Sequence, residues 1–167
     1  MAQSSWGGQE RRASGRRIYE GRILNLRVDE VTMPSGRTAE REVVEHRSAV
    51  GILALTGRDS VLLARQYRYA VGEETLEVCA GLIEPGEDPR AAAERELQEE
   101  LGVKPGRLQE VGGFYSSPGF CTEYLTLFLA DDLQNSRLPQ DEDETRARLL
   151  ARLDAQLDDA VATARLA

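Results

Sequence analysis

The stretch GLIEPGEDPRAAAERELQEELGV, residues 81–103, decides how the chain folds and what it can bind. It carries an unusual density of carboxylates on and just before one short predicted helix: Glu84, Glu87, Glu94, Glu96, Glu99 and Glu100. Like charges three or four residues apart weaken a helix by a few tenths of a kcal/mol per pair. Either this helix face is solvated and the penalty is tolerated, or a cation binds there.

The boundaries of this helix follow from local chemistry. Residues 81–87 contain two glycines and a proline, which predicts a loop. Asp88 is a good N-cap and Pro89 suits the first helical position, so a helix is predicted over residues 90–101. Gly102 is expected to end it. A buried stripe is predicted from apolar residues that recur every four positions: Ala93, Leu97 and Leu101.

On such a helix Glu96 and Glu100 share one face, with Glu99 on its edge and Glu87 just upstream. An oxygen-rich cluster without His or Cys favours a hard cation, Mg²⁺ or Mn²⁺ rather than Zn²⁺. Opposite charges at i,i+4, such as Arg95 and Glu99, are equally typical of an ordinary solvated helix. Spacing alone therefore leaves both interpretations open.

Around the helix, alternating or apolar runs separated by Gly and Pro turns predict β-strands. The predicted strands are 23–33, 39–46, 50–56, 60–67, 76–78, 108–116 and 124–130. Residues 1–16 are polar and predict a flexible tail. Residues 131–144 form an acidic loop, followed by a short strand at 149–153 and a helix. This order predicts a mixed sheet with a helix packed against each face.

Composition limits the class of protein. The chain has 167 residues, 41% hydrophobic and 30% charged, which suits one globular domain. It has neither an apolar run long enough for a membrane span nor an N-terminal signal region, so we expect no membrane partner and a cytoplasmic location. The net charge of −8 argues against nucleic-acid binding. Cys79 and Cys121 match no metal motif and are expected to be reduced, buried thiols.

The same stretch resembles the signature of the Nudix hydrolases. The matching positions are Gly81, Glu87, Arg95, Glu96, Leu97, Glu99, Glu100, Gly102 and Val103. The resemblance implies an α/β (α+β) Nudix fold, an α/β/α sandwich around a mixed β-sheet, here with an N-terminal β-hairpin. It also implies Mg²⁺-dependent hydrolysis of a nucleoside diphosphate linked to another moiety, with Mn²⁺ as an alternative cofactor.

The resemblance also implies roles for individual residues. Glu96 and Glu100 would be the main metal ligands, and Glu99 a further ligand or catalytic group. Arg95 would orient these carboxylates, and Glu87 would tie the loop to the helix. The backbone carbonyl of a residue just before the signature, Ala80, would also meet the metal.

Residues outside the signature resemble the ADP-ribose pyrophosphatase branch of the family. LEVCAGLIEPGE, residues 76–87, is similar to a segment of that branch, with Cys79 where proline is usual. Pro118 stands at the position that marks the branch, although a Ser-Pro-Gly turn would explain it equally well. In the same segment, SSPGFCTE, Glu123 would contact the distal sugar of the substrate.

RQYRYA, residues 65–70, resembles the strand end of the same branch. There Arg68 would meet the phosphates, with Arg65 as a second substrate contact. A guanidinium group matches phosphate oxygens, yet exposed strand arginines would give the same pattern. The acidic loop of this branch supplies the general base. Position favours Glu142, with Glu144 as the alternative or an additional metal ligand. His46 matches no motif and is interpreted as structural or incidental.

The resemblance implies hydrolysis of ADP-ribose to AMP and ribose 5-phosphate. Other nucleotide sugars, flavin dinucleotides and dinucleoside polyphosphates remain alternative substrates, and a non-enzymatic nucleotide-binding domain is a further alternative. The expected organisation is a tail at 1–16, a dimer-forming β-hairpin segment at 17–48 and a Nudix domain at 49–167. A homodimer is therefore expected. The polar, alanine-rich C-terminus departs from the pattern of the branch.

Overall fold

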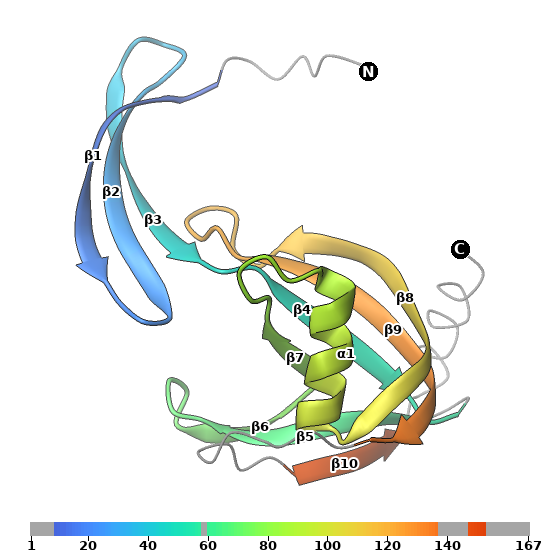
Figure 1. Ribbon diagram of the computed structural model, residues 1–167. Helices are drawn as coiled ribbons and strands as arrows, with labels where there is room; N and C mark the ends of the chain where they lie inside the picture. Colours follow the sequence, from blue (N-terminus) through green and yellow to red (C-terminus); the bar gives the residue numbers. More distant parts are fainter. Residues whose placement is uncertain (1–8, 58–59, 137–146, 153–167) are drawn as a thin grey trace, which may run out of the picture. The chain divides into compact units, whose positions relative to one another are not determined.

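The structure, a computed structural model, describes residues 9–57 and 60–136 and the backbone of 147–152 (Figure 1). The chain divides into two compact units. The N-terminal unit extends to Arg47 and includes Tyr115–Tyr124, and the main unit holds Ser48–Phe114 and the chain from Leu125 onward. No helix within the described ranges has the length and apolar character needed to span a membrane.

The N-terminal unit is built on a three-stranded antiparallel sheet in the order β1-β2-β3. Its strands are β1 (Arg11–Glu20), β2 (Leu24–Thr32) and β3 (Thr38–His46). The predicted hairpin between β2 and β3 is confirmed. Gly36 turns the chain with φ of 81° and donates a 2.9 Å hydrogen bond to the Met33 carbonyl.

The expectation of a flexible tail over residues 1–16 is wrong from Arg11 onward, because β1 begins there. All residues of β1 are exposed, so apolar burial does not hold this strand. A backbone ladder to β2 and ion pairs to β2 and β3 hold it instead. Arg12 lies 3.0 Å from Asp29, and Arg17 lies 2.5 Å from Glu45. The expected hairpin is therefore a three-stranded sheet.

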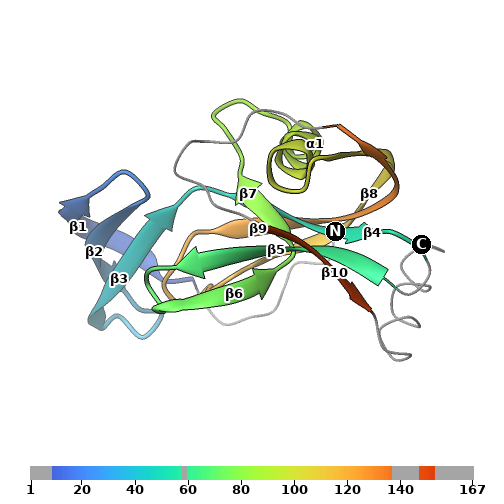
Figure 2. The ribbon, with the colours of Figure 1, turned by 90° about the horizontal axis from the view of Figure 1, so that it is seen from below.

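The main unit is a mixed seven-stranded sheet with one described helix, α1 (Pro89–Glu100) (Figure 2). The strand order is β10-β5-β4-β9-β8, with β6 paired to β5 and β7 paired to β4. β4 runs parallel to β9 and antiparallel to β5 and β7. The strands are β4 (Ala49–Leu55), β5 (Ser60–Arg68), β6 (Glu73–Glu77), β7 (Cys79–Leu82), β8 (Val103–Tyr115), β9 (Tyr124–Asn135) and β10 (Ala147–Arg152).

The two faces of this sheet carry separate apolar clusters. On one face Ile52 packs with Leu62 and with Leu97 of α1, and all three are almost fully buried. On the other face Leu55 and Val61 form a smaller cluster. The alternation of strand side chains between faces explains this division. The second helix, expected to pack against the sheet, falls at residues outside the described part of the chain.

Strands β8 and β9 extend further than predicted. β8 begins at Val103, before the predicted start at residue 108, although Pro105 and Gly106 lie inside it. The glycine is explained by Asp132 of β9, since a Cβ at position 106 would lie 2.3 Å from a carboxylate oxygen of that residue. Asp132 itself has a left-handed φ of 54°, which aspartate tolerates better than most residues.

Candidate active site

Helix α1 forms where its capping residues predict. The Asp88 side chain accepts a 2.9 Å hydrogen bond from the Arg90 amide, and proline occupies the first turn. The helix closes with a 3.1 Å bond from the Leu101 amide to the Leu97 carbonyl, and Gly102 follows with φ of 65°. The predicted buried stripe is confirmed, with Ala93, Leu97 and Leu101 at most 3% exposed.

Two glutamates of α1 are buried, Glu96 at 8% and Glu100 at 7% exposure. Both approach the neighbouring strand β7. The Ala80 amide donates a 3.3 Å hydrogen bond to Oε2 of Glu100. A Cβ on Gly81 would lie 1.9 Å from the Glu96 carboxyl carbon, so only glycine leaves room for this carboxylate. Burying charged groups is unfavourable unless other groups compensate, which marks this face as a candidate functional site.

Arg95 organises the carboxylates around it. Its guanidinium holds both oxygens of Glu87 at 3.0 Å, Glu96 at 2.6 Å and Glu99 at 2.9 Å. It also donates a 3.0 Å bond to the Leu82 carbonyl. One guanidinium thus fixes the loop before the helix and two helix carboxylates. The bidentate contact is the geometry that arginine provides and lysine does not.

These contacts perturb the protonation equilibria of the pair. The hydrogen bond from Arg95 lowers the pKa of Glu87, and the bond to Glu87 is the main reason why the pKa of Arg95 is raised. Glu87 is therefore ionised at neutral pH. A second bond, from the Glu84 amide to Glu87 at 2.9 Å, closes the loop on itself.

Among the described residues, no group of three or more Asp, Glu, His or Cys side chains is arranged to hold a metal ion. The donor set nevertheless fits Mg²⁺ or Mn²⁺. Two buried carboxylates beside the backbone of Ala80 are all-oxygen donors, and Mg²⁺ commonly takes one or two carboxylates with waters and substrate phosphates.

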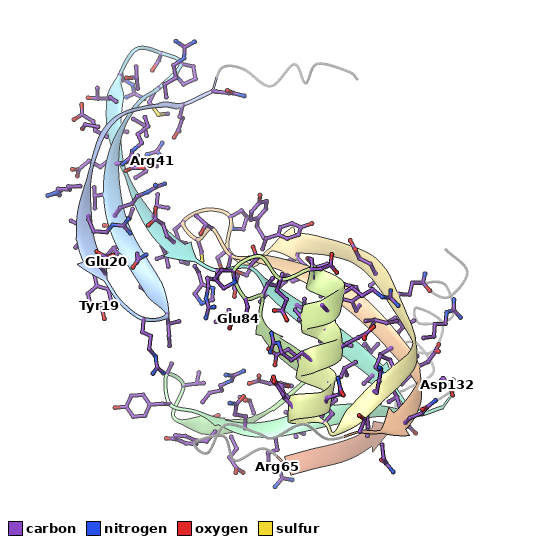
Figure 3. All side chains as sticks on the ribbon, viewed as in Figure 1. Tyr19, Glu20, Arg41, Arg65, Glu84 and Asp132 are labelled. Atoms are coloured by element: carbon purple, nitrogen blue, oxygen red, sulfur yellow. The ribbon has the colours of Figure 1, made fainter. Side chains whose placement is uncertain are left out.

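The two arginines of β5 differ in position. Arg68 lies an even number of residues from Leu62 and Ala64 of the same strand, and these two pack in the cluster that includes α1. Arg65 lies an even number of residues from Val61, which belongs to the cluster on the other face, and Arg65 is exposed (Figure 3). Because strand side chains alternate, Arg68 lies on the face that bears α1 and Arg65 on the other face. The structure therefore does not bring the two arginines together.

The Arg68 side chain is held by β6. Its Nε lies 2.7 Å from Glu77 Oε1 and its Nη2 pairs with the second carboxylate oxygen. Thr75 donates a 2.5 Å hydrogen bond to Oε1 of the same glutamate. Glu77 and Thr75 were not among the site residues predicted from the sequence. Thr75 and Glu77 are two residues apart, which places both side chains on the same face of a strand. This spacing is the feature of the sequence that could have indicated their shared contact.

Pro118 and Glu123 lie in the N-terminal unit. Pro118 sits in a turn that closes with a 2.8 Å bond from the Cys121 amide to the Ser117 carbonyl. Oε1 of Glu123 lies 3.2 Å from Nδ1 of His46. No sequence motif indicates this contact, which joins residues far apart in the chain. Glu142 and Glu144, the predicted base candidates, lie outside the described residues. Both cysteines are free thiols, and Cys79 is buried.

Comparison with known proteins tests the family assignment. Residues 45–166 match the NUDIX domain. The chain belongs to the Nudix family. Residues 10–44 of this Nudix protein match the nucleoside diphosphate sugar hydrolase N-terminal domain. The predicted family is therefore confirmed, and with it the class of hydrolases to which the chain belongs.

Individual relatives agree with this assignment. The Nudix protein is 36% identical over 138 residues to the ADP-ribose pyrophosphatase of Bacillus subtilis, covering 81% of this chain and 75% of that protein. It is 37% identical over 128 residues to the ADP-ribose pyrophosphatase of Mycobacterium tuberculosis, covering 76% and 62%. A crystal structure of an ADP compounds hydrolase shares the fold with a TM-score of 0.82 at 23% identity, covering 95% and 86%.

Proposed function

We propose that this Nudix protein is a Mg²⁺-dependent pyrophosphatase that hydrolyses ADP-ribose to AMP and ribose 5-phosphate. The observation that carries the proposal is the pair of buried glutamates on α1, Glu96 and Glu100, beside the backbone of β7. Buried carboxylates without histidine or cysteine suit a hard cation. The ADP-ribose pyrophosphatases among its relatives support the choice of substrate.

The reaction breaks a phosphoanhydride P–O bond by attack of water on phosphorus. A divalent cation, when bound, neutralises the diphosphate charge and orients the attacking water. Glu96, Glu100 and the Ala80 carbonyl would hold that cation, with Glu99 as a further ligand. Arg95 orients Glu96 and Glu99 through its hydrogen bonds, and the Ala80 amide donates a hydrogen bond to Glu100.

The remaining proposed roles concern the substrate. Arg68, on the face of the sheet that bears α1, would bind the phosphates, and Glu77 fixes its guanidinium. Arg65, on the opposite face, is a weaker candidate for substrate contact. Glu123 would accept hydrogen bonds from the distal sugar, and Pro118 would shape the loop that carries it.

The substrate is tested by product analysis over a panel of ADP-ribose, ADP-glucose, GDP-mannose, NADH, flavin adenine dinucleotide and diadenosine polyphosphates. Each substrate is incubated with the full chain and Mg²⁺ or Mn²⁺. The proposal expects the highest kcat/KM for ADP-ribose. A higher kcat/KM for another substrate would retain the Nudix chemistry and reject the substrate assignment.

The general base is proposed to be Glu142. Its replacement by glutamine should lower kcat by about 10²–10⁴-fold, the usual contribution of general-base catalysis, because the amide cannot accept the water proton. The matched variant is Glu144→Gln. Steady-state turnover of both variants checks the choice, and a larger loss in Glu144→Gln would move the assignment to that residue.

We further infer that the protein is a homodimer through its N-terminal unit, with residues 17–48 as the dimer-forming segment. Several large apolar side chains of this unit are exposed, among them Ile18 at 48%, Tyr19 at 57% and Ile23 at 60%. Exposed apolar side chains that form a patch mark interaction surfaces, and these three are candidates for one.

Replacing Ile18 by glutamate should convert the dimer to monomers, because it would place a charge in a desolvated interface. Light scattering coupled to size-exclusion chromatography measures the mass. Ser14→Glu, which changes a polar exposed residue on the same strand, is the control. A monomeric wild-type protein would contradict the dimer.

A further inference from the structure

The segment that follows β8 is anchored to the end of β3 by backbone pairing. Val44 and Cys121 form a parallel bridge. The Val44 amide donates a 2.7 Å bond to the Phe120 carbonyl, and the Thr122 amide donates a 3.0 Å bond to the Val44 carbonyl. Both partners belong to the N-terminal unit. The loop that carries Glu123 is therefore positioned by the last residues of β3.

His46 continues this pairing. Its amide donates a 3.0 Å hydrogen bond to the Thr122 hydroxyl, which in turn donates a 3.2 Å bond to the His46 carbonyl. His46 lies two residues after Val44, and Glu123 lies two residues after Cys121. The parallel register of the bridge therefore places the histidine beside Glu123. The His46 Nδ1 lies 3.2 Å from Glu123 Oε1, and the two side chains are only 17% and 23% exposed.

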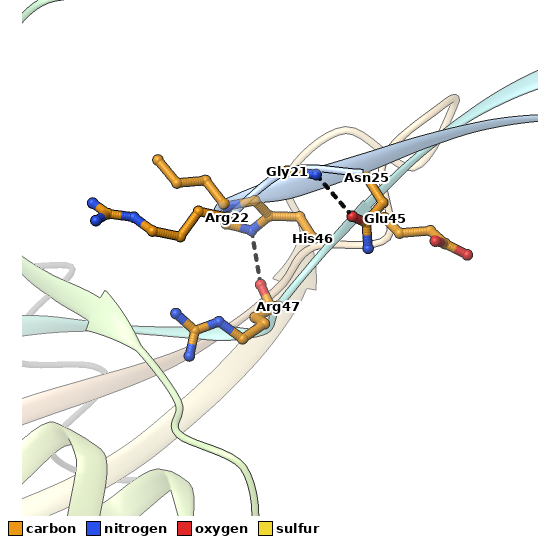
Figure 4. A pocket seen from close by; sticks show the side chains of 7 residues that line it. Gly21, Arg22, Asn25, Glu45, His46 and Arg47 are labelled. Carbon is orange, nitrogen blue, oxygen red and sulfur yellow. Dashed lines mark hydrogen bonds between the residues drawn. The ribbon is translucent and has the colours of Figure 1, made fainter. Parts of the chain in front are cut away.

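The proton on the His46 ring can be placed from its neighbours. Nδ1 lies 2.8 Å from the Arg47 carbonyl oxygen (Figure 4) and 3.2 Å from the Glu123 carboxylate. Both are acceptors, so Nδ1 must be the donor. The Nδ1–H is donated to the carbonyl, which fixes the ring, and the fixed ring holds Nδ1 within ion-pair distance of the carboxylate. His46 also lines a cavity of about 370 Å³ together with Arg22 and Arg47.

We propose that His46 is a positioning residue for Glu123: its ring, fixed by the Arg47 carbonyl, contacts the carboxylate through Nδ1 and keeps it in the orientation that meets the distal sugar of the substrate. The proposal rests on the proposed function, which assigns Glu123 to that sugar. A carboxylate held in one rotamer loses less conformational entropy when it binds. A polar ligand group that is correctly oriented before binding therefore contributes more to specificity.

Two nearly isosteric variants test the role. In His46→Asn the amide nitrogen occupies the place of Nδ1, whereas His46→Leu removes the donor. His46→Leu should raise KM for ADP-ribose by roughly tenfold, about the contribution of one polar contact to a charged group, with kcat little changed. His46→Asn should restore most of the loss. Equal effects of the two variants, or a fall in kcat alone, would overturn the proposal.

A double-mutant cycle separates positioning from folding. If His46 acts through Glu123, His46→Leu should have no further effect on KM in a Glu123→Gln background. A purely structural histidine would give additive losses. If His46→Leu does not fold, the same cycle is run with His46→Ala, which also removes the ring, and additive effects there overturn the proposal.

A readout independent of activity distinguishes this proposal from the function on which it rests. The chain has one histidine, so its ring resonances are unambiguous. Nitrogen-15 NMR should show a protonated Nδ1, and Glu123→Gln should shift its resonance, whereas Glu40→Gln on the same strand should not. An unprotonated Nδ1 would overturn the contact. Failure to hydrolyse ADP-ribose, with this NMR result intact, would overturn the proposed function instead.

Discussion

Replacing Glu100 by glutamine should lower AMP release from ADP-ribose by more than about 100-fold. Replacing a residue that only supports a metal ligand already lowers metal affinity or activity by roughly 10–100-fold. Glu100 is proposed as a ligand itself, so the loss should be larger. The fold should survive, because the glutamine oxygen can still accept the bond from the Ala80 amide. Glutamine also removes a charge that is only 7% exposed. Steady-state kinetics with saturating Mg²⁺ measures the loss.

The control for this variant is Glu94→Gln, on the same helix, whose carboxylate lies 3.7 Å from Arg90. It should retain nearly full activity. Thermal unfolding adds a second readout, since Mg²⁺ that binds only the native protein raises its Tm. That increase should be present in the wild type and weak in Glu100→Gln. Wild-type turnover of Glu100→Gln would remove Glu100 from the metal site.

Replacing Gly81 by alanine should lower kcat by about 100-fold, the loss that a displacement of roughly 1 Å can produce. The new Cβ would lie 1.9 Å from the Glu96 carboxyl carbon and 2.0 Å from Oε1. The contacted atoms are the end of a flexible side chain, so the carboxylate can swing aside. We therefore expect a folded protein with a misplaced Glu96. Kinetics and the unfolding temperature together check this.

Gly106→Ala is the matched control for the clash itself. There a new Cβ would lie 2.3 Å from an Asp132 carboxylate oxygen, again at the end of a side chain. Asp132 has no proposed catalytic role, so activity should stay close to wild type. If both alanine variants lose activity equally, the loss at Gly81 is not specific to Glu96.

The parts of the fold that depend on local chemistry were predictable. Asp88, Pro89 and Gly102 define the ends of α1, and the structure places the helix between them. The turn at Gly36 likewise follows from the residues of the turn itself. The approach of α1 to β7 was not visible in the sequence, although the small residues Ala80 and Gly81 permit it.

Features held together by distant residues were not predictable. β1 has the composition of a tail, and its order depends on pairing with β2 and on ion pairs such as that between Arg12 and Asp29. The pair of His46 and Glu123 joins two segments through a parallel bridge. No periodicity or spacing within one segment encodes such contacts. The choice between Glu142 and Glu144 lies outside the described residues and stays a prediction.

AMP formation from ADP-ribose by the purified full chain, with Mg²⁺ and then with excess chelator, shows whether the protein is a Mg²⁺-dependent pyrophosphatase. We expect AMP and ribose 5-phosphate in equal amounts with Mg²⁺. The chelator should abolish the reaction, and added Mg²⁺ should restore it. Absence of AMP with any divalent cation, or a rate unchanged by the chelator, would rule out this activity.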